Sequence, residues 1–195
     1  MNKKLFFVPV LFSLLMTSCS KEAEVTVTVS GKVENSYKET SPITVTLDGG
    51  ASVGKSTIAD ANGNYTFTNV SIGYDYTIGV AQKDSDPKIN ASTFDLVLLG
   101  KQISSGQTTN DSFVLVAMDL DNSGSIDDED TEIFRSLLLI GSSSKIPDYG
   151  FYRFIPNGFD FKTSTNAKVN RFEVKKLNAD INIPTFKAVK IGDFK

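Results

Sequence analysis

The clearest pattern along the chain is an alternation of apolar residues with threonine and other polar residues. It runs over residues 25–29, 43–47, 65–67 and 76–80. A period of two places alternate side chains on opposite faces of an extended strand. Glycine-containing pairs at residues 49–50, 62–63 and 72–73 separate the runs and indicate turns. This spacing predicts a small antiparallel β-sandwich over residues 25–82.

After residue 83 the pattern becomes helical. Residues 92–103 begin with Ser92 or Thr93 as a helix N-cap and continue as an apolar run, which predicts a helix. A second helix is expected after Asp130, because apolar residues recur at i, i+4 spacing over 133–138. Gly141, followed by three serines, should end it. Residues 112–118 are a short apolar run that we interpret as a buried strand or short turn.

The strongest chemical signal is the twelve-residue segment 119–130. Its side-chain oxygens recur at Asp119, Asp121, Ser123, Asp127 and Asp130. Ca²⁺ takes about six to eight oxygen ligands, which alternate residues of a curled loop direct inward. Ser125, at the seventh place, would contribute its backbone carbonyl, and Asp127 often acts through water. Gly124 permits the sharp turn. We expect a Ca²⁺ site here; the alternative is an acidic surface turn.

Asp130 stands at the twelfth place, where an EF-hand has Glu, and the segment is followed by a single helix. It therefore resembles the type I dockerin repeat, which comes in pairs. Asp95 lies 35 residues before Asp130, so counting back places Asp84 and Asp86 at the first and third positions of an upstream loop. The next two key positions hold a lysine and an isoleucine. This degenerate half would be a packing copy or a weak site.

The tail offers a residue that would complete that weak site. In dockerins a Gly-Asp pair commonly opens a calcium loop, and here Gly192 and Asp193 stand near the end of the sequence. Asp193 would then complete a split second site with Asp84, Asp86 or Asp95. The alternative, which we favour, is that residues 186–191 form a closing strand and Asp193 faces solvent.

Four segments carry a wider resemblance: residues 92–98, the calcium loop, residues 152–156 and residues 186–193. In order and spacing they resemble a module common in secreted proteins of Bacteroidetes bacteria. The resemblance implies a dockerin-like, calcium-binding accessory module over residues 83–195, and it does not imply catalysis. It also implies that the aromatic residues after Pro147 form core, whereas an exposed row would stack on sugar rings. These residues are Tyr149, Phe151, Tyr152, Phe154, Phe159 and Phe161.

The N-terminal half carries a second resemblance, through residues 31–33, 45–47, 60–65 and 73–78. Their order resembles carboxypeptidase-regulatory-like or Cna-B-like domains, which share a transthyretin-like sandwich and usually serve as spacers or binding modules. The expected fold is therefore mainly β with a small α part: a transthyretin/Ig-like sandwich, a dockerin-like loop–helix pair and a β-rich C-terminal segment. A fold alone does not give a function.

The start of the chain is typical of a bacterial lipoprotein. Lys3 and Lys4 precede an apolar run of twelve residues, 5–16, which is too short to span a bilayer. Small residues then lead to Cys19, the only cysteine in the chain, as in a lipobox. We expect residues 1–18 to be a signal peptide, Cys19 to be lipidated and residues 19–24 to be a tether. The acidic tether resembles the signal that exports lipoproteins to the cell surface, so we expect a surface-exposed outer-membrane protein; a plain tether would look the same.

Charge and composition exclude several classes of function. Removal of residues 1–18 takes away two lysines, so the formal net charge changes from −3 to −5, which gives no electrostatic footprint for nucleic acid. Residues 49–56 fit the phosphate-loop pattern G-x-x-x-x-G-K-[ST]. That loop requires a following helix, but residues 57–67 predict strand, turn and strand. We expect no nucleotide binding and a solvated Lys55.

The sequence has no histidine, and its cysteine is assigned to lipid, so Cys–His and Ser–His–Asp catalysis are excluded. We expect a non-enzymatic, calcium-stabilised lipoprotein that serves an outer-membrane complex or another exported protein. Two alternatives remain open. One is a true dockerin bound to a cohesin-like partner, although positions ten and eleven of the two loops differ (Asp128-Glu129 against Thr93-Phe94). The other is a glycan-binding lipoprotein of a polysaccharide-utilisation system.

Overall fold

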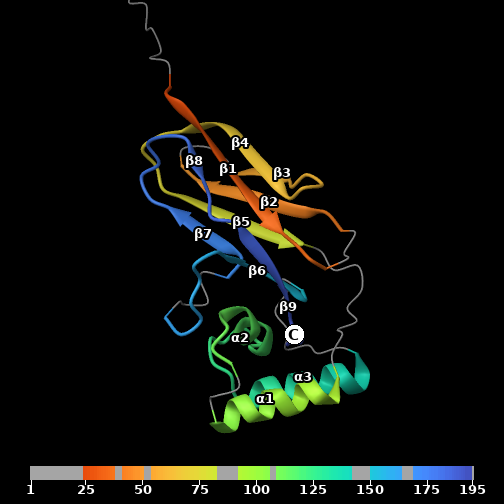
Figure 1. Ribbon diagram of the computed structural model, residues 1–195. Helices are drawn as coiled ribbons and strands as arrows, with labels where there is room; N and C mark the ends of the chain where they lie inside the picture. The colour runs from red at the N-terminus through yellow and green to blue at the C-terminus, as the bar shows by residue number, and fades with distance from the viewer. Residues whose placement is uncertain are drawn as a thin grey trace, which may run out of the picture.

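The computed structural model describes residues 24–37, 41–50, 54–82, 92–105, 109–141, 150–163 and 169–194. Within these ranges the chain forms nine strands and three helices. Figure 1 shows the strands gathered in one part of the molecule and the helices in another. The first strand begins at the end of the molecule farthest from the helices.

The strands form two sheets. The strands of the first are β1 (Thr26–Glu34), β4 (Asn64–Ser71), β6 (Tyr152–Pro156), β8 (Ile181–Asn182) and β9 (Phe186–Lys190). They follow the order β4-β1-β9-β6, and β8 pairs with β1 outside this path. The strands of the second, in the order β3-β2-β5-β7, are β3 (Lys55–Ile58), β2 (Ile43–Gly49), β5 (Tyr76–Gln82) and β7 (Arg171–Val174). All four runs of alternating residues in the N-terminal half form strands, which confirms that prediction.

Strands from the C-terminal segment complete both sheets. β9 runs parallel to β1, with Phe186 opposite Val33, and antiparallel to β6. β7 pairs with β5 in the second sheet. The expected division at residue 82 therefore divides the sequence but not the sheets, because the parts before and after it share their hydrogen-bonded ladders.

The two sheets share one apolar core, whose members come from both. It includes Val29 and Phe67 of the first sheet, Val45 and Ile78 of the second, and Phe154 of β6. Each such side chain contributes about 1.5–3 kcal/mol when fully buried. The observed fold is mainly β with a small helical part, as predicted.

The helices α1 (Thr93–Ser105), α2 (Ser112–Met118) and α3 (Asp128–Ile140) surround a second apolar core. α1 and α3 lie side by side (Figure 1), and Gly141 ends α3 in a left-handed conformation, as expected. Ile155 of β6 and Val189 of β9 belong to this second core. Every residue of β6 is buried, because the strand is covered by the sheet core on one face and by the helices on the other.

The expectation that residues 112–118 form a strand or short turn was wrong, because they form α2. A short apolar run with β-branched residues does not reveal its period. The conformation is decided first by Asp111, whose side chain accepts a hydrogen bond from the Phe113 N–H at 2.8 Å, an N-cap interaction that favours a helix. At the other end of α2, the helical conformation is stabilised by hydrogen-bond donors from distant segments of the chain, which are described below.

The aromatic residues after Pro147 lie in the cores, as expected, so far as the structure describes them. Tyr152 and Phe154 are buried in the sheet core, while Phe151, Phe159 and Phe161 pack against the helical core. Tyr149 lies outside the described residues. The predicted closing strand is β9. No helix in the described part of the chain is both long enough and apolar enough to cross a membrane.

Candidate metal centre

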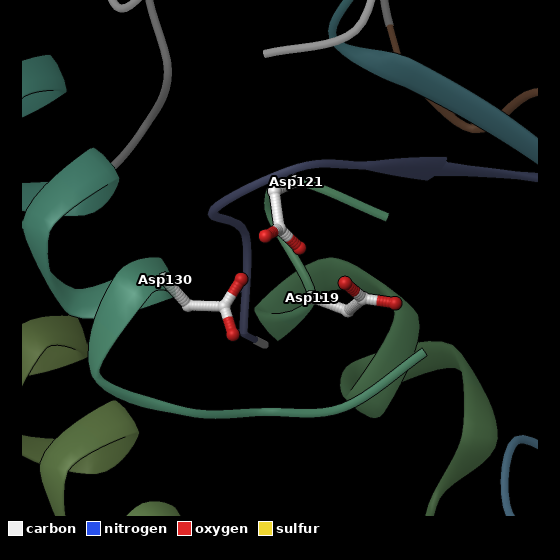
Figure 2. Close-up of side chains that lie close together, drawn as sticks. All are labelled: Asp119, Asp121 and Asp130. Carbon is white, nitrogen blue, oxygen red and sulfur yellow. The ribbon is translucent and has the colours of Figure 1, made fainter. Parts of the chain in front are cut away.

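The predicted calcium loop connects α2 to α3, so a helix both precedes and follows it. Asp119 is the C-cap residue of α2, and Asp130 lies in the first turn of α3. Their carboxylates and that of Asp121 offer oxygens within 4.8 Å of one another. Figure 2 shows the three side chains around one space. Among the residues that the structure describes, no other group of three histidine, cysteine, aspartate or glutamate side chains meets this spacing.

Backbone N–H groups curl the loop around these carboxylates. Ser123 N donates to Oδ1 of Asp119 and to Oδ1 of Asp121, each at 2.9 Å. Gly124 N donates to Oδ2 of Asp119 at 3.0 Å. Gly124 has a φ of 86°, a conformation that a side chain would disfavour. The glycine predicted at the sixth place therefore makes this turn.

Asp130 closes the loop. Its Oδ1 accepts from Leu120 N at 2.7 Å, and its Oδ2 accepts from Asp127 N at 2.9 Å. The Asp127 side chain in turn accepts from Glu129 N at 2.9 Å. It also accepts from the backbone N–H of Asp130, and this bond and the Asp127 N bond to Asp130 together form a capping box at the start of α3. One carboxylate thus joins the beginning of the loop to its end.

Two of the three carboxylates are removed from water: Asp119 is 2% exposed and Asp130 is 0% exposed. Burial raises the pKa of Asp119 to about 7, against the opposing effects of the Arg153 charge and the Gly124 hydrogen bond. Burial likewise raises the pKa of Asp130 to about 6, against the hydrogen bonds from Asp127 and Leu120. Buried carboxylates are costly unless a cation or enough donors stabilise them.

The residues present fit a divalent cation. When ionised, the three carboxylates carry three negative charges, and the adjacent Arg153 carries one positive charge. The remaining −2 equals the charge that a divalent cation neutralises. The donors are all oxygens, which suit Ca²⁺, Mg²⁺ or Mn²⁺, and a loop of oxygen ligands at alternate positions is the arrangement that Ca²⁺ uses.

The other predicted ligands lie in the exposed part of the loop. Ser123 Oγ is 3.3 Å from the Ser125 carbonyl and 3.1 Å from its hydroxyl. Ser125 Oγ donates to Oδ2 of Asp127 at 3.4 Å, and Asp127 also caps α3. The structure therefore brings together Asp119, Asp121 and Asp130. Ser123, Ser125 and Asp127 form a connected polar chain beside them.

Arg153 is a residue of this site that the sequence reasoning missed. It belongs to β6, yet it is 0% exposed, and its guanidinium donates to backbone carbonyls of α2 and the loop. The available signal was an arginine inside an otherwise apolar strand, since buried charges are rare unless they have partners.

The split second site stays a prediction, because Asp84 and Asp86 lie outside the described residues. Asp95 is buried, and its Oδ2 accepts bonds from both the N–H (2.8 Å) and the hydroxyl (2.7 Å) of Ser92. Asp193 is half-buried beside Tyr37. Burial is the main cause that raises the pKa of Tyr37, and the Asp193 carboxylate adds to it. We expected Asp193 to face open solvent, but it lies beside Tyr37.

Lys55 of the phosphate-loop pattern lies in strand β3. Its Nζ donates to the carbonyls of Thr68 and Asn69, at 2.8 and 2.6 Å. Lys55 is therefore an anchored strand lysine rather than a solvated loop lysine. Residues 55–71 form strand, turn and strand, without the helix that a phosphate loop requires.

Comparisons with protein-family models, with curated proteins and with solved structures gave no match. The two resemblances noted in the sequence stay predictions. The predicted signal peptide and Cys19 lie outside the described residues, so lipidation also stays a prediction.

Proposed function

We propose that this chain is a non-enzymatic, calcium-binding surface lipoprotein that acts as an accessory or interaction subunit of an outer-membrane protein complex. The observation that carries the proposal is the convergence of Asp119, Asp121 and Asp130 within 4.8 Å in a loop between two helices. Calcium would be held by these carboxylates and would neutralise buried charge. Its role is structural, because it stabilises the loop that joins α2 to α3.

The finer description of the fold belongs to the same proposal. The two-sheet part is proposed to be a transthyretin/Ig-like sandwich of the carboxypeptidase-regulatory-like kind. The helices α1 and α3 are proposed to be the two halves of a dockerin-like pair, supported by Asp130 at the twelfth place of the loop. Helix α2, which enters the loop, makes this segment closer to a helix–loop–helix than the sequence suggested.

A non-enzymatic role is supported by composition. The full sequence contains no histidine and a single cysteine, and that cysteine is the proposed lipidation residue. The acidic side chains that cluster in the described part are those of the calcium loop. Burial and hydrogen bonding of these groups suit metal binding, and their role as ligands leaves them no role as acid and base.

The proposed lipid anchor at Cys19 gives the molecule an orientation. β1 begins at the end opposite the helices (Figure 1). A tether that precedes β1 would hold this end nearest to the membrane, and the helices would face outward. A protein partner is supported by exposed apolar side chains on α1 and α3, because covering such side chains removes them from water. They are Phe94 (66% exposed), Val97 (53%), Leu139 (83%) and Ile140 (73%).

A cohesin-like protein is one example of a protein partner that would cover these exposed side chains.

Glycan binding is a second candidate function, and one observation favours it. A pocket of about 670 Å³ lies on the second sheet and is lined mainly by small polar and charged residues. These include Thr44, Thr46, Asp48, Thr77, Asn122, Asn170 and Arg171. Hydroxyl, amide and charged groups could hydrogen-bond to sugar hydroxyls. The aromatic residues after Pro147 that the structure describes pack in the cores, so they do not offer a stacking surface for sugar rings.

Calcium titration by calorimetry tests the central claim. The wild-type chain should bind Ca²⁺, and Asp121→Ala should weaken binding strongly, because it removes one of the three converging carboxylates. Asp128→Ala is the matched control, because Asp128 is an exposed aspartate of the same loop–helix segment outside the cluster. Absence of calcium binding by the wild type would refute the proposal.

Two cellular experiments test the remainder. Cys19→Ala should release the protein from the membrane fraction; persistence there after a high-salt wash would contradict the lipid anchor. A pulldown from outer membranes, with and without chelator, should recover membrane proteins in a calcium-dependent manner. Recovery of a cohesin-bearing scaffold would favour the dockerin alternative, and retention on a polysaccharide column would favour the glycan alternative.

A further inference from the structure

Arg153 connects the calcium loop to the sheet. It is the second residue of β6 and stands between Tyr152 and Phe154, which both belong to the sheet core. Its own side chain leaves that core and reaches the end of α2. The side chain is 0% exposed, so its charge is fully removed from solvent. A buried guanidinium is retained only where several acceptors satisfy it.

The acceptors are backbone carbonyls around the first calcium ligand. Nη1 donates to the Val116 carbonyl at 3.0 Å and also to the Asp119 carbonyl. Nη2 donates to the Leu120 carbonyl at 2.8 Å. The last carbonyls of any helix lack partners within the helix, and arginine side chains can supply them. Here the Arg153 side chain alone donates hydrogen bonds to a carbonyl in the last turn of α2 and to the carbonyls of the first two residues of the loop.

The C-terminal segment also contacts the end of α2. Gly192 N donates to the Ala117 carbonyl at 3.0 Å, the residue after the Val116 carbonyl that Arg153 binds. Phe194 stacks on Phe134 of α3, with ring centroids 5.3 Å apart. The end of α2 and the start of the loop are therefore held by groups from β6 and from the segment after β9.

We propose that Arg153 is a positioning residue for the calcium site. It fixes the backbone on both sides of Asp119, so that this carboxylate is in place before the ion arrives and binding does not have to order it. The inference rests on the proposed calcium binding. The planar guanidinium offers two separate nitrogens in a fixed fork, whereas lysine offers one compact charge and cannot span the same carbonyls.

Arg153 also has a second effect on calcium affinity, which acts in the opposite direction to positioning. Its positive charge repels a cation, so its removal would tighten calcium binding if charge dominated. Positioning predicts weaker binding instead. Arg153→Lys keeps the charge but loses the fork, and Arg153→Met loses both. The direction of the change in calcium affinity therefore separates the two effects.

The test is calcium titration by calorimetry on the full chain, at a temperature where every variant is folded. Arg153→Lys and Arg153→Met should raise the Kd for Ca²⁺ by about 10- to 100-fold, the size typical of residues that orient metal ligands. The matched control is Phe154→Leu, which alters the neighbouring residue in the sheet core. It should lower the melting temperature while leaving the Kd unchanged.

An unchanged Kd in Arg153→Lys, or tighter binding in Arg153→Met, would overturn the inference. An equal loss of affinity in Phe154→Leu would also overturn it, because the effect would then be general destabilisation. These outcomes differ from failure of the proposed function, in which the wild-type chain itself would bind no calcium.

Discussion

The two cores of this molecule are built differently. The sheet core is apolar and draws on both sheets. The helical core is also apolar, but three charged groups are buried around the loop at its edge: Asp119, Asp130 and Arg153. Burial of apolar side chains stabilises a fold without a bound ion. Buried charges stabilise it only when other charges and hydrogen bonds balance them.

This difference teaches where calcium should matter. We expect the sheet part to be insensitive to calcium, because its core is apolar, whereas the helical part gathers negative charge that a divalent cation would neutralise. β6 and β9 belong to both: β9 pairs with β1 and β6 pairs with β9, while Ile155 of β6 and Val189 of β9 pack in the helical core. Loss of calcium should therefore weaken the helical part first and reach the sheets through these two strands.

The largest expected effect comes from the sheet core. Ile78→Ala should lower the free energy of unfolding by about 2–5 kcal/mol, because it leaves a cavity at a fully buried site. The loss should be equal with and without calcium, as measured by chemical denaturation in both conditions. A loss that depended on calcium would contradict the separation between the two cores.

The next effect belongs to the loop. At a calcium concentration a hundredfold above Kd, binding should stabilise the wild type by about 2.7 kcal/mol. Asp130→Ala should abolish this increment, because Asp130 supplies a converging carboxylate and also closes the loop. The measurement is the difference between unfolding free energies with and without calcium. The control Asp128→Ala should keep the full increment.

The response to pH should also separate the two conditions. The pKa values of Asp119 and Asp130 are raised by burial, to about 7 and about 6, from an ordinary value of 3.8. A raised carboxyl pKa contributes stability below the unfolded value that is lost as pH rises through the folded value. Calcium-free protein should therefore lose stability between pH 5 and pH 7, by on the order of 1 kcal/mol per pH unit.

Calcium should reverse this trend, because the ion binds the ionised carboxylates. The experiment compares urea denaturation of metal-free and calcium-saturated protein across the same pH range. Asp119→Asn should flatten the calcium-free profile. The lowered pKa values of the exposed Asp60 and Asp75 act below this range, so they do not disturb it. A calcium-free stability that rises with pH would contradict the prediction.

The smallest effect is expected at the start of α2. Asp111→Ala removes the side chain that accepts the Phe113 N–H and should cost about 1 kcal/mol. Asp111→Asn keeps an acceptor and should cost much less. Thermal denaturation of the three proteins in calcium-free buffer would measure this. Equal melting temperatures for Asp111→Ala and the wild type would show that the cap does not determine this helix.

Much of this architecture could be predicted from the sequence, because it follows from local patterns. The alternating runs became β1, β2, β4 and β5, since a period of two is compatible only with an extended strand that has one buried face. The helices α1 and α3 followed from capping residues and apolar spacing. The convergence of Asp119, Asp121 and Asp130 followed from ligand spacing around Gly124, because a twelve-residue loop determines much of its own curvature.

The tertiary structure alone decided the rest. The α2 segment became a helix partly because Arg153 and Gly192 supply its last carbonyls, from 37 residues away in the first case. The parallel pairing of β9 with β1 merged two segments that the sequence had separated at residue 82. Such features depend on partners distant along the chain, and no local pattern of side chains encodes which strand or carbonyl a residue will meet.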